Sequence, residues 1–346
     1  MRHLGLPRRR LVASLLGGCG LAATGCRWTL ADDARFLRIG TGPITGTYYP
    51  VGELIASVVS SPPGARPCGP EGGCGVPDLV VVVQTSKGSV DNVSAIQEGQ
   101  IESGFSQSDI AYGAFSGTGI FAGRPPMQNL RALASLYLES VHLVARAGSG
   151  IASVADLRGQ RVSLDVEGSG TLVEARLILD AFGLSERAVT PVYASLVKSI
   201  DLMRADELDA LFFVGGYPAA AVSELARDTG AKLVPIVGPG IEALLGKHRF
   251  FTKHTIPGGT YPGLDEDTPT IGVAALWLVS AGLDEDLVHA ITEALWHPNA
   301  AKVLAAGHPK GKEIRPEDAL RGVAIPLHPG AARYYREHGI AENGDE

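Results

Sequence analysis

Glycine or polar side chains with hydroxyl, amide or carboxyl groups gather in five short stretches of the sequence, a composition that suits hydrogen bonding to a small ligand. The stretches are residues 41–48, 86–92, 107–109, 167–171 and 215–218. Glycine lets a ligand approach the backbone, and free N–H groups at a helix start attract an anionic group such as a carboxylate. The predicted ligand-binding residues are Thr45, Gly46, Thr47, Tyr48, Ser89, Asn92, Gln107, Asp109, Ser169, Gly170, Thr171, Gly215 and Tyr217.

Each stretch also has a purely structural interpretation. Residues 89–92 and 169–171 suit helix N-caps, Gln107 could satisfy a buried backbone group, and the tyrosines could belong to the core. The recurrence of such stretches in matching positions favours a binding site. None of them contains arginine, so the alternative is that an arginine from elsewhere, such as Arg131 or Arg146, binds the anion.

The usual catalytic motifs are missing from the sequence. Residues 168–170 do not form the Gly-x-Ser-x-Gly nucleophile turn, and no phosphate-binding Gly-x-x-x-x-Gly-Lys-Ser/Thr is present. The glycine spacing of residues 40–46 is wrong for a dinucleotide site, and the nine histidines form no His-Glu-x-x-His pair. Acidic residues 265–267 favour a solvated turn over a cation site. We therefore predict a binding protein, with no catalytic residues, cofactor or metal.

A strand–turn–helix pattern must position these stretches. It occurs three times within residues 39–137 and restarts at Val141. The apolar run 78–84 predicts a strand buried on both faces. Other expected segments are separate strands at 130–137 and 141–145, an irregular region at 250–267, and an apolar strand at 270–279 that could cross between lobes. The alternation predicts a doubly wound α/β fold with the polar turns at the carboxyl ends of parallel strands, where ligands bind in such sheets.

The N-terminus has the features of a targeting segment. Four arginines precede the short apolar stretch 11–23, so residues 1–31 are predicted to be an export signal. Lipid attachment at Cys26 is the alternative to a soluble exported form. The leader holds five arginines and no acid, which leaves 25 basic and 37 acidic residues and a net charge of −12. So acidic a chain is a poor candidate for binding nucleic acid, and no later stretch predicts a transmembrane helix.

Only two cysteines remain beyond the leader, Cys68 and Cys74, in a loop rich in proline and glycine. In an oxidising compartment such a pair is expected to form a disulfide. A metal site is the alternative, but the sequence places no histidine nearby. The disulfide is therefore the prediction.

Seven segments, taken together and in this order, carry a resemblance to a known family. They are IGTGPITGTYYPVGELIA (39–56), GSVDNVSAIQEGQIESGFSQSD (88–109), LRALASLYLESVHLVAR (130–146), VADLRGQRVSL with GSGT (154–171), LDALFFVGGYPAAAVSELA (208–226), TYPGLDEDTPTIGV (260–273) and PLHPGAARYYREHG (326–339). With them the chain resembles the TAXI subfamily of solute-binding proteins for TRAP (tripartite ATP-independent periplasmic) transporters. The resemblance covers nearly all of the chain after the leader. Residues 60–77, with the cysteine pair, look like an insertion relative to plainer members.

The resemblance implies a two-lobe periplasmic-binding-protein fold of the second type, with a ligand cleft between α/β lobes. Lobe 1 would comprise residues 34–138 and 254–346, and lobe 2 residues 139–253. It also implies a periplasmic receptor, expected to be a monomer, that closes on a small carboxylate such as glutamate or 2-oxoglutarate. The receptor would deliver this solute to the membrane subunits of a TRAP permease. The alternatives are a sensor-linked binding module and an enzyme on the same two-lobe fold.

Overall fold

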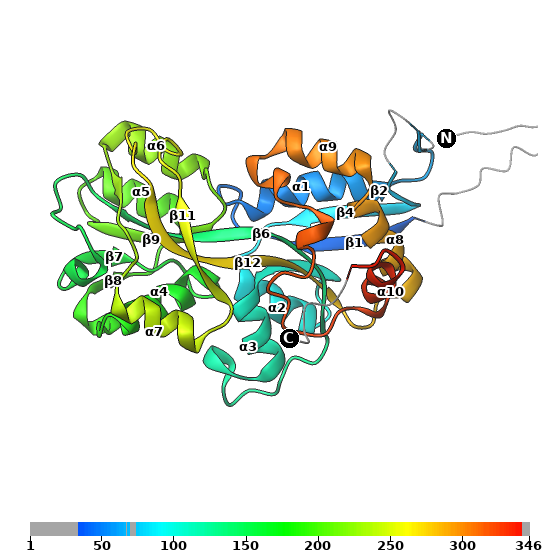
Figure 1. Cartoon of the computed structure of the whole chain (residues 1–346), viewed down its shortest axis with the longest axis horizontal. Coiled ribbons are helices and arrows are strands. Elements are labelled where there is room, and N and C mark those ends of the chain that lie inside the picture. Colours follow the sequence, from blue (N-terminus) through cyan, green and yellow to red (C-terminus); the bar gives the residue numbers. More distant parts are fainter. Residues whose placement is uncertain (1–33, 67, 70–73, 341–346) are drawn as a thin grey trace, which may run out of the picture. The chain divides into compact units, whose positions relative to one another are not determined.

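Two long antiparallel strands, β6 (Leu130–Ala145) and β12 (Thr268–Ser280), pair along much of their length in the centre of one twelve-stranded sheet (Figure 1). The computed structural model describes residues 34–66, 68–69 and 74–340. The predicted export signal and Cys26 lie outside the described residues. The described residues form one compact unit.

On one side of the central pair, three neighbouring strands run parallel to one another. They are β1 (Arg35–Gly40), β4 (Leu79–Gln84) and β5 (Ser103–Gln107). Gly40 lies opposite Gln84 of β4 and Gly104 of β5. Because parallel strands share their carboxyl edge, the turns that follow them lie on the same edge of the sheet. These turns lead into α1 (Tyr48–Val59), α2 (Ser89–Gln97) and α3 (Ser108–Ser116).

A second parallel group lies on the other side of the central pair. It consists of β9 (Ala210–Gly215), β7 (Arg161–Ser163) and β8 (Thr190–Val192), and β9 pairs antiparallel with β6. The helices that follow these strands are α4 (Gly170–Ala181), α5 (Leu196–Arg204) and α6 (Ala220–Thr229), with α7 (Pro239–Lys247) beyond them. The predicted α/β fold class is confirmed.

The hydrophobic core divides into four clusters that together cover both faces of the sheet. Near β1 and β4, α1 shares a core with the C-terminal helices α8 (Glu285–Leu295), α9 (Pro298–Gly307) and α10 (Pro329–Glu337). Helices α2 and α3 pack on the other face. In the second group, α4 and α7 share one core while α5 and α6 share another. β6 contributes to all four clusters, so the central pair joins the two groups.

The structure corrects three expectations about the strands. Residues 130–145, expected as two strands, form a single strand, because Glu139 and Ser140 between them are buried opposite Val273 and Gly272 of β12. The region expected to be irregular contains β11 (Phe251–Ile256), which pairs with β12. β4 is not buried on both faces, since Val82 is 40% exposed. The predicted lobe boundaries fall inside β6 and β11, and the division into lobes stays a prediction.

The loop between α1 and β4 carries the predicted disulfide. Cys68 and Cys74 are bonded, which confirms that prediction. Two short strands, β2 (Ser60–Ser61) and β3 (Val76–Pro77), pair at the two ends of this loop. β10 (Lys232–Leu233) completes the sheet at β6. Within the described residues, no helix is both long and apolar enough to cross a membrane.

Candidate ligand-binding site

A narrow cavity of about 50 Å³ lies where the polar turns of the two strand groups meet. Most of the predicted ligand-binding residues line it: Thr45, Gly46, Thr47, Tyr48, Ser89, Gln107, Ser169, Gly170 and Thr171. The structure therefore brings together turns that are up to 126 residues apart in the sequence, from Thr45 to Thr171. Their role in binding a ligand stays a prediction.

The turn before α1 forms one wall of the cavity. The Gly46 amide donates to the Pro43 carbonyl at 2.9 Å, which closes the turn. The Thr47 hydroxyl donates to the Gly216 carbonyl at 3.0 Å and so ties the start of α1 to the segment after β9. The Thr45 Oγ1 is buried and has no hydrogen-bond partner in the part of the chain that the structure describes. A buried hydroxyl without a partner is costly unless a ligand supplies one.

The helix starts around the cavity differ in how their amides are capped. Ser169 caps α4, where its Oγ accepts a hydrogen bond from the Leu172 amide. At α1 and α2 the N-cap residues, Thr47 and Gly88, make no side-chain cap bond. Gly88 has φ of 119°, a conformation that favours glycine. The Asp91 main-chain amide in the first turn of α2 donates to the Gly168 carbonyl at 3.1 Å. The other first-turn amides of α1 and α2 receive no bond from the N-cap side chain, so these helix starts are suited to an anionic oxygen.

A chain of buried hydrogen bonds connects the floor of the cavity. The Tyr48 hydroxyl donates to Glu139 Oε2 at 3.0 Å. The Ser89 hydroxyl donates to the side-chain Oε1 of Gln107 at 2.6 Å and accepts from the main-chain amide of Gln107 at 3.1 Å. Gln107 packs so closely on Gly170 that a Cβ there would overlap its Oε1. Glycine at position 170 is therefore what allows α4 to start against the end of β5.

Glu139 is the acidic group at the centre of this network, and sequence analysis missed it. Burial raises its pKa to about 8, although hydrogen bonds from Tyr48 and Gln107 and the charge of Lys310 act in the opposite direction. Below that pH the side chain is mostly a neutral acid, which has a proton to donate. The signal was present in the sequence: a single carboxylate stands inside the mostly apolar run LYLESVHLVA.

Two further charged residues line the cavity and were also missed. Lys87 belongs to the turn before α2 and is the one basic side chain among the lining residues. Asp165 follows β7 with φ of 72°, and burial raises its pKa to about 6. At neutral pH the lining therefore holds one cation, one carboxyl group that is largely ionised, and the largely neutral Glu139.

Four predicted residues do not line this cavity. Asn92 holds the strand ends instead, since its Nδ2 donates to the carbonyls of Gly40, Thr41 and Phe105. Gly215 ends β9. The Tyr217 ring lies 4.0 Å from Lys310 Nζ in a cation–π contact. The fourth, Asp109, lines a separate, largely apolar cavity of about 460 Å³ between α3, α4 and the start of β11.

The carboxyl groups of Asp109 and Glu174 lie near Glu139 and interact with it electrostatically. Glu174 is fully buried, and in the described residues neither of its oxygens has a hydrogen-bond partner, nor does Asp109 Oδ1. Burial raises the pKa of both, that of Asp109 to about 7. The raised pKa values mean that these buried carboxyl groups are protonated over part of the physiological pH range.

The arginines proposed as alternative anion-binding groups have other roles. Arg131 donates to the carbonyls of Gln128 and Leu130. Arg146 forms ion pairs with Asp206 and Asp209 at 2.8 and 3.1 Å. Neither of them lines the cavity.

The sequence profile of the NMT1-like family matches residues 39–339. Among solved structures, the chain is similar to the periplasmic aliphatic sulphonate binding protein SsuA of Escherichia coli, with 13% identity, 87% of this chain and 78% of that chain covered, and a TM-score of 0.42. SsuA of Xanthomonas axonopodis pv. citri bound to MOPS is 17% identical, with 88% of this chain and 93% of that chain covered and a TM-score of 0.44. An ancestral arginine-binding protein bound to arginine is 14% identical, with 81% of this chain and 97% of that chain covered and a TM-score of 0.45. Likeness at this level identifies no ligand.

Proposed function

The chain belongs to the NMT1-like family, and on that premise we propose that it is an extracytoplasmic solute receptor. Its ligand is a small anionic solute, with a carboxylate such as glutamate or 2-oxoglutarate as the expected class. The receptor delivers this solute to the membrane subunits of a TRAP permease and has no catalytic role.

The observation that carries the proposal is the cavity itself. Thr45 presents a buried hydroxyl that no neighbouring group of the described chain satisfies. The starts of α1 and α2 add amides without side-chain caps, and Lys87 adds a positive charge. Neutral Glu139 removes one negative charge that would repel an anion, and the charge of Lys87 offsets that of the largely ionised Asp165. Together these groups support binding of a small group with several acceptor oxygens.

The size of the cavity limits what this arrangement admits. A water molecule needs about 10–15 Å³ measured in the same way, so about 50 Å³ holds only a few waters. A solute the size of glutamate therefore requires the walls to separate before it enters. We propose that the two strand groups move apart about β6 and β12, in the manner of hinge closure in binding proteins.

Native mass spectrometry of protein purified without refolding tests the proposal. It should reveal one small anionic solute bound per chain, and incubation with that solute should return it unchanged. A bound cation or neutral solute would contradict the anionic class, and a chemically altered product would favour the enzyme. Uptake into vesicles that contain TRAP permease subunits then separates a transport receptor from a sensor-linked module, which should bind the solute without supporting uptake.

A further inference from the structure

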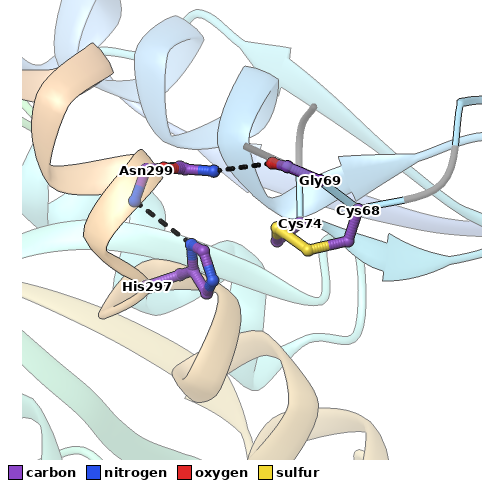
Figure 2. Close-up of a disulfide and its surroundings, with 5 residues drawn as sticks. All are labelled: Cys68, Gly69, Cys74, His297 and Asn299. Carbon is purple, nitrogen blue, oxygen red and sulfur yellow. Dashed lines mark hydrogen bonds between the residues drawn. A yellow bond between two sulfur atoms is a disulfide. The ribbon is translucent and has the colours of Figure 1, made fainter. Parts of the chain in front are cut away.

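The disulfide loop lies beside a histidine from a distant part of the chain (Figure 2). One ligand atom each from Cys68, Cys74 and His297 lie within 4.8 Å of one another. Among the residues that the structure describes, no other three His, Cys, Asp or Glu side chains come this close. The sequence suggested that no histidine was near the cysteine pair; that inference was wrong, because the fold places the start of α9 against the loop.

The contact between the loop and α9 is held by hydrogen bonds on the helix side. His297 is the N-cap of α9, and its Nδ1 accepts a hydrogen bond from the main-chain amide of Asn299 at 3.1 Å. The Asn299 side chain donates to the Gly69 carbonyl at 3.2 Å (Figure 2). Gly69 directly follows Cys68 in the sequence, so these bonds fix the histidine relative to the cysteine pair.

We propose that this cluster is a redox-controlled site for a thiol-seeking metal ion of the Zn²⁺ type. Reduction of the disulfide by a dithiol reductant transfers two electrons and two protons, which gives two Cys thiols and the oxidised reductant. The metal ion then displaces the two thiol protons and binds both thiolates and one His297 nitrogen. Two thiolates and an imidazole form a ligand set that suits Zn²⁺, with water at a fourth position.

The geometry requires only modest movement. In a tetrahedral site with Zn–S of about 2.3 Å and Zn–N of about 2.0 Å, ligand atoms lie roughly 3.3–3.8 Å apart. The two sulfur atoms must separate once their bond is broken, while the histidine is already within reach. If Nδ1 binds the metal, its lone pair can no longer accept the cap bond. If Nε2 binds the metal, the proton moves to Nδ1, which then cannot accept that bond either. Metal binding should therefore exchange the bond from the Asn299 amide for coordination.

The test is a titration of the full chain with Zn²⁺ alone, in competition with a coloured chelator, after anaerobic reduction and removal of the reductant. The reduced chain should bind one Zn²⁺ more tightly than the oxidised chain does. The double variant Cys68→Ser, Cys74→Ser, which keeps Cys19 and Cys26, should lose this binding. Co²⁺ in place of Zn²⁺ should give thiolate charge-transfer absorption in the reduced chain alone.

The role of the histidine is separated from its capping role by His297→Asn. Asparagine is a good N-cap but a poor ligand for a thiolate-bound metal, so α9 should remain while affinity falls at least about tenfold. His289→Asn, at a histidine that pairs with Glu337, is the matched control and should bind as the unaltered chain does. Equal affinity in the reduced chain and the double serine variant would overturn the proposal. So would an unchanged affinity in His297→Asn, or the absence of thiolate bands with Co²⁺.

Discussion

At the scale of single residues, Glu139 is the most informative group in the candidate site. It is 1% exposed, accepts a hydrogen bond from Tyr48, and has a pKa raised to about 8 by burial. A carboxyl group whose pKa is higher in the folded than in the unfolded chain stabilises the fold fully below its unfolded pKa of about 4.5. That stabilisation is lost as the pH rises through the folded pKa.

We therefore expect Glu139→Gln to change the pH dependence of stability. The free energy of unfolding of the variant, minus that of the unaltered chain, should be larger at pH 8.5 than at pH 5 by an amount on the order of a few kcal/mol. Urea unfolding at the two pH values measures this gain. Glu224→Gln, at an exposed position on α6, is the control and should show no such gain. Parallel pH profiles for Glu139→Gln and the unaltered chain would contradict the assignment.

The two cavity glycines should respond differently to alanine. A Cβ at Gly170 overlaps Gln107, whereas a Cβ at Gly46 would lie 3.3 Å from the Pro43 carbonyl oxygen. Gly170→Ala should therefore destabilise the chain by about 1–3 kcal/mol, the usual cost of overpacking, and Gly46→Ala by less. Thermal unfolding of both variants compares them, and a greater loss in Gly46→Ala would refute this account of the α4 start.

At the scale of secondary structure, the candidate site depends on hydrogen bonds that join the start of one helix to a strand from another part of the sequence. Thr171, in the first turn of α4, accepts a hydrogen bond from the buried Val214 amide of β9 at 3.1 Å. Thr171→Ala leaves that amide without a partner and should cost about 1–3 kcal/mol of stability. Thr171→Ser, which keeps the acceptor, should recover most of it. Urea unfolding measures both, and equal losses would show that the methyl group matters more than the bond.

Local patterns predicted the turns and helix starts because glycines, hydroxyls and apolar spacing act over a few residues. Ser89, Gln107 and Gly170 were found in this way. Glu139 was missed because its burial depends on pairing with β12, about 130 residues later in the chain. His297 was missed for the same reason, since only the folded tail brings it to Cys68. Asn92 was also selected in this way, but sequence does not distinguish a side chain that binds strand-end carbonyls, as Asn92 does, from one that binds a ligand.

At the scale of the whole unit, β6 and β12 are the elements that join the two strand groups. The pairing of the two strands is irregular at two places along β12, between Ala275 and Leu276 and between Trp277 and Leu278. The cavity of about 50 Å³ is narrow, so solute entry requires a more open arrangement. We expect the radius of gyration from small-angle scattering to be smaller at saturating solute than without it. An unchanged radius would contradict closure about these strands.

The central claim is that the solute binds in the cavity lined by Thr45, and calorimetry of Thr45→Val tests it most directly. Valine has the shape of threonine but lacks the hydroxyl, and that hydroxyl bonds to no other group in the described chain. With the solute identified by mass spectrometry, the variant should bind about fivefold more weakly, the usual effect of one lost hydrogen bond of about 1 kcal/mol. Its thermal stability without solute should be unchanged or higher. Unchanged affinity together with lower stability would show that the hydroxyl serves the fold and that the solute binds elsewhere.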